Sequence, residues 1–303
     1  MDRRTFLKII GSGVVGVATG NLLTPGKSSA EESLSGKEFY GILVDTTRCI
    51  GCRSCEKACA EVNGLPIPDI SETTNETVIK SLRQTTDTQY TITNKYETGR
   101  GTIFVPKRCM HCNQPGCVAA CPVKAMKKRP TGHVTWASNC IGCRLCMVSC
   151  PFDIPKFEYE KAIPRIQKCN LCWDRFNQGE LPGCVEVCPT QALMAGSRRQ
   201  ILEEGKRRIS ANPDKYIDHI YGEYEAGGTS HLYLSAVQFD QIGFRKDVGI
   251  KPYPEYSAPY LNAIPFIATL TPLFMLAISA AVKMGKENQK EKNEEKNEGK
   301  GKH

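Results

Sequence analysis

The chain has 303 residues, a formal net charge of +8 and sixteen cysteines. Charged residues make up 24% of the sequence and hydrophobic residues 40%, which excludes a wholly disordered chain. Only five histidines accompany the cysteines, too few for an array of Cys₂His₂ zinc fingers. Disulfides, Cys₄ zinc sites and iron–sulfur clusters are the remaining uses for so many cysteines.

The first 30 residues have the features of an export signal. The sequence Arg3-Arg4-Thr5-Phe6-Leu7-Lys8 precedes a weakly apolar, glycine-broken run over 9–23. This order is typical of a twin-arginine signal, and the run is a poor membrane span. The small residues Ser28-Ser29-Ala30 predict cleavage before Glu31. The alternative is a chance arginine pair on a cytoplasmic amphipathic helix.

All sixteen cysteines fall into four motifs of the form C-x₂-C-xₙ-C-x₃-C. In chain order the motifs are Cys49, Cys52, Cys55 and Cys59; Cys109, Cys112, Cys117 and Cys121; Cys140, Cys143, Cys146 and Cys150; and Cys169, Cys172, Cys184 and Cys188. Proline follows the last cysteine of every motif except the first, where Ala60 stands. Bacterial ferredoxins have this spacing: three close thiolates bind one cubane cluster, and the fourth binds the other cluster of a pair.

The two alternatives fit the spacing less well. A tetrahedral zinc site needs two separated C-x₂-C hairpins rather than overlapping thiols followed by x₃-C. Disulfides are compatible with export, but closely spaced C-x₂-C-x₂-C runs make poor disulfide frameworks. The twin-arginine route also carries folded proteins with cofactors already inserted. Iron–sulfur clusters are therefore the favoured interpretation.

The segments between the motifs give a coarse secondary structure. Residues 62–108 form a polar insertion of the kind that covers a site or meets a partner. Residues 125–138 predict a hairpin with its turn at Thr131-Gly132. Residues 197–209 predict a helix with Ser197 as its N-cap.

Several side chains near the cysteines have two possible roles. Arg53 and Arg144 could raise a cluster potential, but we expect solvated surface charges. His111 is expected to pack or to hydrogen-bond sulfur, since four cysteines already suffice as ligands. Trp136 and Trp173 are expected to be core aromatics rather than electron stepping stones. We expect no residue set for bond-making catalysis.

A second targeting feature lies near the C-terminus. Residues 261–282 contain no charge and would form a helix about 33 Å long, enough to cross a bilayer. Membrane helices tolerate its internal prolines better than soluble helices do. Lysines follow from Lys283 onward, which by the positive-inside rule puts the C-terminus in the cytoplasm. The tail 283–303 is low in complexity and is predicted to be disordered.

The positive charge is located mainly at the two ends. Residues 1–30 carry +3 (four bases against Asp2), and the tail carries +2 (seven lysines against five glutamates). Only +3 remains on residues 31–282, so the charge reflects targeting and topology, and we expect no nucleic-acid partner.

These motifs together resemble a known family. The segments Cys109-Met110-His111-Cys112, Gly142-Cys143-Arg144-Leu145-Cys146, 181–189 and 221–229 are similar to the four-cluster iron–sulfur subunits of membrane-bound respiratory oxidoreductases. The similarity extends over essentially the whole chain, is greatest for the hydrogenase-2 branch, and is next greatest for formate dehydrogenase beta subunits. It implies an α+β fold of two pseudo-symmetric ferredoxin-like dicluster units with insertions, plus one C-terminal transmembrane helix.

The resemblance also implies which cysteines bind which cluster. Fourth ligands are exchanged between paired motifs in this family. Four [4Fe–4S] clusters would then be held by Cys49, Cys52, Cys55 and Cys188; by Cys169, Cys172, Cys184 and Cys59; by Cys109, Cys112, Cys117 and Cys150; and by Cys140, Cys143, Cys146 and Cys121.

The implied function is electron transfer on the periplasmic face of the cytoplasmic membrane. The partners would be a catalytic subunit, a nickel–iron hydrogenase in the first instance, and a membrane subunit that binds quinone or haem. A molybdopterin enzyme such as formate dehydrogenase is the alternative catalytic partner. A zinc-stabilised, membrane-anchored binding protein is the alternative from a different class.

The predicted domain organisation follows from these features. Its parts are a signal over 1–30, a four-cluster domain over 31–210, an extension of that domain over 211–260, a transmembrane helix over 261–282 and a cytoplasmic tail over 283–303.

Overall fold

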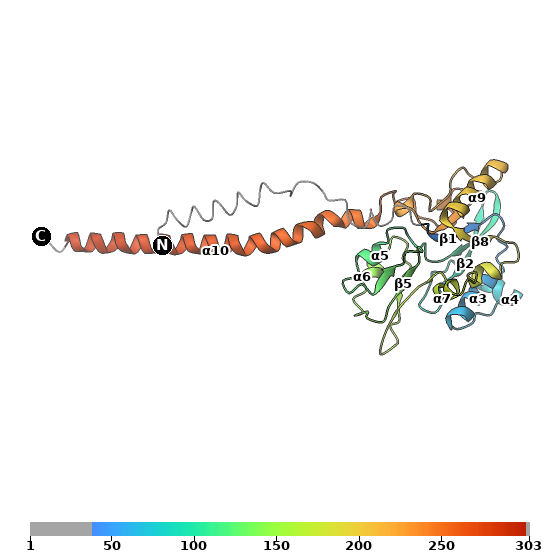
Figure 1. Cartoon of the computed structure of the whole chain (residues 1–303), viewed down its shortest axis with the longest axis horizontal. Helices are drawn as coiled ribbons and strands as arrows, with labels where there is room; N and C mark the ends of the chain where they lie inside the picture. Colours follow the sequence, from blue (N-terminus) through green and yellow to red (C-terminus); the bar gives the residue numbers. More distant parts are fainter. Residues whose placement is uncertain (1–37, 301–303) are drawn as a thin grey trace.

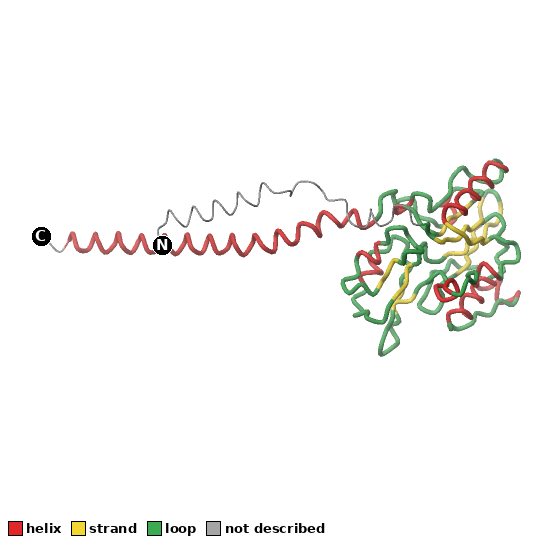
Figure 2. The backbone as a smooth tube through the Cα atoms, in the orientation of Figure 1, coloured by secondary structure: helices red, strands yellow, loops and turns green. Residues whose placement is uncertain are grey.

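One long C-terminal helix projects from a folded body. The structure is a computed structural model and describes residues 38–300. In the long helix, α10 (Tyr253–Lys300), side chains are described for 253–256 and 263–287. The predicted export signal lies outside the described residues. Figure 1 shows α10 leaving the body, and Figure 2 shows that the body mixes short helices and strands, which agrees with the predicted α+β class.

A three-stranded sheet joins the beginning and the end of the body. Its order is β8 (Leu193–Ser197), β1 (Tyr40–Asp45), β9 (His231–Leu234). β1 pairs with β8 antiparallel and with β9 in parallel. β9 belongs to the segment 211–260, so this predicted extension supplies an edge strand to the same sheet.

The side chains of β1 alternate between two cores, as expected for a strand buried on both faces. Leu43 packs with Ile201 on one face of the sheet. Ile42 and Val44 pack on the opposite face, where the core includes Cys55 and other residues of the cysteine motifs. The sheet therefore separates an ordinary aliphatic core from the core that surrounds the cysteines.

Helix α9 (Arg198–Ala211) covers the aliphatic face. The Gln200 amide donates to the Ser197 hydroxyl, and the Gln200 side chain accepts from the Ser197 amide. This capping box satisfies amides that the first turn would otherwise leave unpaired. The helix predicted over 197–209 is confirmed.

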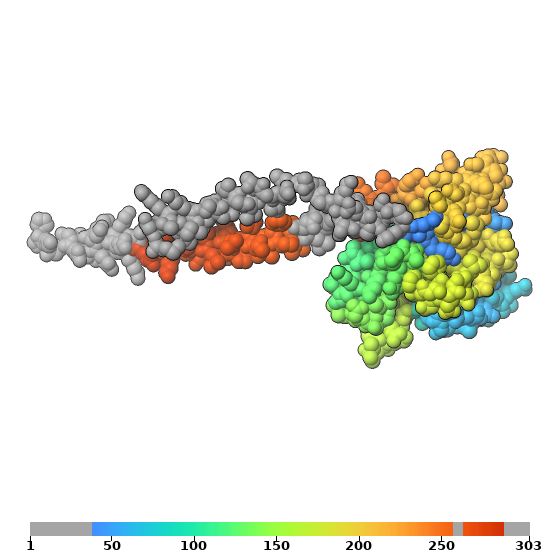
Figure 3. All heavy atoms as spheres, in the orientation of Figure 1, coloured from blue at the N-terminus to red at the C-terminus, as the bar shows by residue number. Residues whose placement is uncertain are grey.

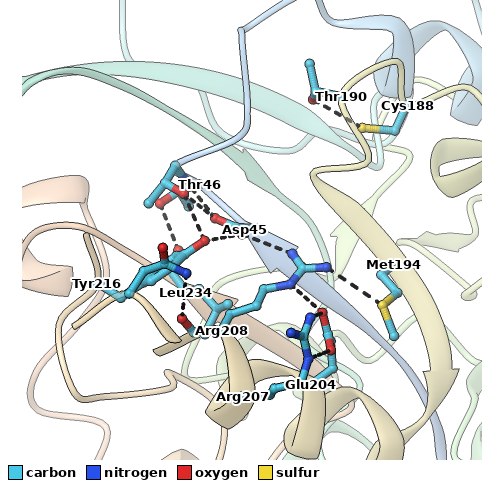
Figure 4. Close-up of polar contacts among 12 residues, drawn as sticks. Asp45, Thr46, Cys188, Thr190, Met194, Glu204, Arg207, Arg208, Tyr216 and Leu234 are labelled. Atoms are coloured by element: carbon cyan, nitrogen blue, oxygen red, sulfur yellow. Dashed lines mark hydrogen bonds and ion pairs between the residues drawn. The ribbon is translucent and has the colours of Figure 1, made fainter. Parts of the chain in front are cut away.

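The buried Asp45 fixes α9 to the end of β1 (Figure 4). Its carboxylate accepts from Arg208 Nη1 at 3.0 Å and from the Tyr216 hydroxyl at 2.8 Å. Thr47 donates to the other carboxylate oxygen at 2.7 Å, and Glu204 accepts from Arg208 at 2.7 Å. A buried carboxylate is stable only with such partners, so this network holds the helix against the sheet.

Two helix pairs bring together motifs that are distant in the sequence. α3 (Ser54–Asn63) of the first motif packs against α8 (Gly183–Glu186) of the fourth. α5 (Gly116–Ala119) of the second motif packs against α6 (Leu145–Val148) of the third. The unit formed by the second and third motifs is thus inserted within the unit formed by the first and fourth.

Glycines allow both helix pairs to approach closely. A Cβ atom on Gly183 would lie 2.8 Å from Cγ2 of Val62. A Cβ atom on Gly116 would lie 2.6 Å from the carbonyl oxygen of Ser149. Both distances are shorter than normal carbon contacts, so a side chain at either position would separate the paired motifs.

The insertion over 62–108 is a folded element. It contains α4 (Glu72–Val78) and a hairpin of β2 (Ile92–Thr98) with β3 (Gly101–Lys107). The hairpin covers the first motif, since the hydroxyl of Thr93 lies 3.7 Å from Cys55 Sγ. Of the two roles expected for the insertion, covering the cysteines is seen at the first motif.

The second-and-third-motif unit carries two small hairpins. β4 (Met126–Lys128) pairs with β5 (Val134–Trp136), which confirms the hairpin predicted over 125–138. β6 (Lys156–Phe157) pairs with β7 (Ile166–Gln167). The remaining short elements are α7 (Trp173–Asn177), η1 (Glu225–Gly227) and η2 (Phe239–Ile242).

Helix α10 contains the apolar segment predicted to cross a membrane. Ala263–Glu287 is long and apolar enough for a span, and none of its most apolar window is buried against the body. The helix continues to Lys300, whereas we expected a disordered tail from residue 283. The tail contains seven lysines and five glutamates, which lose little rotamer freedom in a helix, and this explains the difference.

Candidate metal centre

Each cysteine motif begins with the same left-handed turn, two residues after its first cysteine. The residues and their φ angles are Gly51 (73°), His111 (48°), Gly142 (71°) and Leu171 (58°). This turn aims amides at sulfur: the amides of Gly142 and Leu171 each donate to the sulfur of the motif's first cysteine at 3.4 Å. Left-handed backbone at His111 and Leu171 costs roughly 1–2 kcal/mol per residue. The motif spacing did not reveal this feature, because only two of the four residues are glycines.

A second left-handed residue follows the three motifs that end in Cys-Pro. It lies three residues after the last cysteine, at Lys124 (52°), Asp153 (50°) and Gln191 (50°). In the first motif, which lacks the proline, α3 continues instead as far as Asn63. The sequence repeat is therefore also a repeat of backbone conformation.

The first thiol group (Cys49, Cys52, Cys55 and Cys188) lines a single pocket together with Ile50 and Pro189. Three of its cysteines come from the first motif and one from the fourth. Burial raises the pKa of Cys49 to about 11, and the charges of Cys52 and Cys188 add to the increase. The four thiols are thus close neighbours.

The fourth thiol group (Cys121, Cys140, Cys143 and Cys146) lines an equivalent pocket. Here three cysteines come from the third motif and one from the second. Burial raises the pKa of Cys146 to about 11, and the other three thiols raise it further. Trp136 also lines this pocket, and Cys143 is exposed to solvent.

The remaining eight cysteines form two inner groups. The second thiol group is Cys59, Cys169, Cys172 and Cys184, and the third is Cys109, Cys112, Cys117 and Cys150. Burial raises the pKa of Cys59 to about 12, and the charges of Cys184 and Cys172 act in the same direction. Burial also raises the pKa of Cys112, as do the charges of the other three members of the third group.

The four groups follow one another in a single order. Cys55 of the first group and Cys184 of the second belong to one buried cluster. Cys59 and Cys169 of the second group pack in another cluster with Cys109 of the third. Cys117 of the third group packs in a further cluster with Cys146 of the fourth. The order is therefore first, second, third, fourth.

The donor set fits iron–sulfur clusters. All sixteen cysteines are free thiols, which does not support the disulfide interpretation. Thiolate is the soft ligand that iron–sulfur clusters use, and burial of the thiols disfavours their charged form unless a metal centre compensates. Four convergent thiols in an enclosed pocket provide that combination.

A mononuclear zinc site is a poorer fit. Sulfurs around one tetrahedral zinc ion lie about 3.8 Å apart, given Zn–S bonds of about 2.3 Å. Among the described residues no group of three or more Cys, His, Asp or Glu side chains is arranged to hold a single metal ion. Ligands to separate corners of a cluster lie farther apart, so iron–sulfur clusters do not require such a compact group.

Arg53 is not the solvated charge that we expected. It is buried, and its Nε donates to Glu56 at 3.1 Å. Arg83, from the insertion, donates to the same carboxylate at 2.6 Å. The insertion covers this position, which the local sequence does not reveal. Arg144 is exposed as expected and stacks on the ring of Phe157.

The other singled-out side chains pack near the thiol groups. His111 is buried, and its Nδ1 accepts from the Val134 amide at 3.0 Å, in agreement with a packing role. Trp173 contacts the ring of His133, with 5.0 Å between ring centroids. Trp136 is half-buried against the fourth thiol group, so it is both a packing residue and part of that pocket.

Two family descriptions match the chain, and both are 4Fe-4S dicluster domains. One covers residues 48–125, and the other covers residues 101–198. Together they include all four cysteine motifs.

Curated relatives match over most of the chain. A protein of Nitratidesulfovibrio vulgaris is 44% identical over 290 residues, which is 93% of this chain and 77% of the relative. The hydrogenase-2 operon protein HybA of Escherichia coli O157:H7 is 34% identical over 81% of this chain and 84% of its own length. The iron-sulfur subunit of nitrate-inducible formate dehydrogenase from Escherichia coli K12 is 35% identical over 63% of this chain and 66% of its own length.

Proposed function

Because the chain belongs to the family of 4Fe–4S dicluster iron–sulfur subunits that includes HybA and the iron–sulfur subunits of formate dehydrogenases, we propose that it carries electrons between a catalytic partner and a membrane partner. The chain is an electron-transfer subunit of an oxidoreductase complex and not a catalytic subunit. Its dicluster domains and sixteen cysteines give four [4Fe–4S] clusters.

We propose that each thiol group binds one cluster. The exchange of fourth ligands is supported by Cys188 in the first group, Cys59 in the second, Cys150 in the third and Cys121 in the fourth. The two helix pairs and the repeated left-handed turns support two pseudo-symmetric units.

The linear order of the thiol groups is the observation that carries the proposal. Bound clusters supply reversible one-electron chemistry. The chain holds their thiolate ligands in order, covers the first thiol group with the β2–β3 hairpin, and donates amide hydrogens to sulfur. These contacts, together with nearby charges, set the potentials.

The two ends of the series reach the surface at different places. The fourth group belongs to the unit drawn in green in Figures 1 and 3, on the side of the body from which α10 projects. A Cβ atom on Gly116 of this unit would lie 3.3 Å from Cβ of Tyr253 at the start of α10. Ile141 and Val148 beside this group are exposed. We assign this end to the membrane partner. The first group, beside the exposed Ile50, then faces the catalytic partner.

The topology that we propose combines both ends of the chain. The twin-arginine segment 1–30 would export the body to the periplasm, and α10 would anchor it with the C-terminus in the cytoplasm. The apolar, unburied span Ala263–Glu287 supports the anchor. Fusing alkaline phosphatase after residue 303 tests the orientation: an inactive fusion is expected, and an active one contradicts a cytoplasmic C-terminus.

A nickel–iron hydrogenase is the catalytic partner that we favour. The similarity to HybA extends over 84% of that protein, against 66% for the nitrate-inducible formate dehydrogenase subunit. A molybdopterin enzyme such as formate dehydrogenase is the second candidate. Hydrogen should reduce the clusters in the detergent-solubilised native complex, and reduction by formate alone would favour the second candidate.

Metal analysis tests the proposal at its base. The full-length protein should contain about sixteen iron atoms and about sixteen acid-labile sulfides per chain, and it should be brown. About four zinc ions and no visible colour would instead support a zinc-stabilised binding protein.

A further inference from the structure

Arg108 is a buried cation without a carboxylate partner. It follows β3 and immediately precedes Cys109, and it is 2% exposed. Its Nη1 lies 2.8 Å from the sulfur of Cys184, and its Nε and Nη2 have no partner. Within the part of the chain that the structure describes, no carboxylate lies within ion-pair distance of it. Burying a guanidinium in this way is costly unless negative charge faces it.

The thiols nearest to Arg108 belong to the second thiol group, and those of the first group lie behind them. The guanidinium contacts Cys184 of the second group at 2.8 Å, and Cys184 packs with Cys55 of the first group in one buried cluster. Thiolates of these two groups would supply the negative charge that the buried guanidinium needs.

Lys168 occupies a comparable place beside the third group. It immediately precedes Cys169, is buried, and donates to the backbone carbonyls of Cys169 at 2.9 Å and of Val134. Val134, whose carbonyl accepts from Lys168, packs with Cys117 of the third group in one buried cluster. Each cation thus comes from the chain segment ahead of one motif and faces thiols of the other unit.

We propose that Arg108 is a tuning residue that raises the reduction potential of the cluster at the second thiol group and, to a smaller extent, of the cluster at the first. The inference rests on the proposed assignment of clusters to the thiol groups. A bound cluster would take up one electron from its donor and give one to its acceptor, so it would carry one more negative charge in its reduced state. A fixed positive charge and an N–H···S hydrogen bond both stabilise that more negative state.

The test compares two neutral variants of the full-length, cluster-loaded protein in detergent. Arg108→Gln removes the buried charge. Arg48→Gln is the matched control, because Arg48 also immediately precedes the first cysteine of a motif but is only half-buried. The readout is a potentiometric titration of the cluster EPR signals. At the wild-type midpoint of the affected cluster, Arg108→Gln should lower the ratio of reduced to oxidised cluster at least tenfold, about 59 mV for a one-electron couple.

Arg48→Gln should change the ratio of reduced to oxidised cluster less than threefold for each of the four clusters. Unchanged ratios in Arg108→Gln with full iron content would overturn the inference, as would an equal shift in both variants. If Arg108→Gln does not retain its iron, the deciding variant is Arg108→Lys, which keeps the positive charge. A ratio of reduced to oxidised cluster within threefold of the wild type then supports the inference, and a tenfold decrease in that ratio overturns it. A wild-type protein without iron and sulfide would instead overturn the proposed function.

Discussion

The insertion 62–108 should depend on the carboxylate of Glu56 for its attachment to helix α3. This carboxylate lies on α3 between Cys55 and Cys59, and it accepts from the Thr93 amide at 2.6 Å and from Arg83 Nη2 at 2.6 Å. Both donors belong to the insertion 62–108. Glu56→Gln keeps the size of the side chain and removes the charge, so two arginines lose their counter-ion.

The expected cost can be worked out from burial. The side chains of Glu56 and Arg53 are each 2% exposed. Breaking such a buried pair by removing one partner costs about 3–5 kcal/mol. In a body of this size, 1 kcal/mol shifts the melting temperature by about 2–4 °C, so Glu56→Gln should melt roughly 6 to 20 °C lower.

Glu61 provides a matched control on the same helix. It pairs with Lys57 at 4.0 Å, and the two side chains are 48% and 47% exposed. An exposed pair of this kind contributes about 0.2–1 kcal/mol, so Glu61→Gln should melt within a few degrees of the wild type. The assay is thermal loss of the visible cluster absorbance in the detergent-solubilised chain, with limited proteolysis of the insertion as a second readout. Equal melting of the two variants would refute the reasoning.

Three further predictions follow from other contacts. Gly116→Ala should push α5 away from α6, because the added Cβ would lie 2.6 Å from the Ser149 carbonyl oxygen, and the iron content of the protein should decrease by up to about half. The control is Gly99→Ala, which has nothing within 4 Å of the added Cβ and should keep all its iron. Equal iron content in the two variants would contradict the close approach of α5 and α6. Burial lowers the pKa of His133 to about 4, so below pH 6.5 the unfolded chain binds a proton that the folded chain does not, and stability should decrease as pH is lowered. Between pH 8 and pH 5, His133 should account for about 2 kcal/mol of the decrease in the free energy of unfolding. If the melting temperature of His133→Phe depends on pH as that of the wild type does, His133 does not make this contribution. Deleting residues 261–303 should release the protein from the membrane fraction with its iron content intact, and continued membrane association would show that the body itself is attached.

Local patterns could be predicted from the sequence because their physical causes are local. The C-x₂-C spacing places neighbouring thiols on one turn, and Ser197 caps a helix through contacts within three residues. The turn at Thr131-Gly132 joins two strands whose paired residues are at most ten positions apart in the sequence. The apolar run in α10 is long enough for a membrane span whatever it contacts.

The sequence by itself determined the number of thiols, their spacing and a C-terminal segment long and apolar enough to span a membrane. Only the tertiary structure decided which thiols meet and in what order, because the contact of α3 with α8 joins segments more than a hundred residues apart. It also decided the environment of each charge. Arg53 and Arg144 occupy the same place in their motifs, yet the folded insertion buries Arg53 and leaves Arg144 in solvent. Solvation depends on what covers a side chain, and residues far along the chain supply that cover.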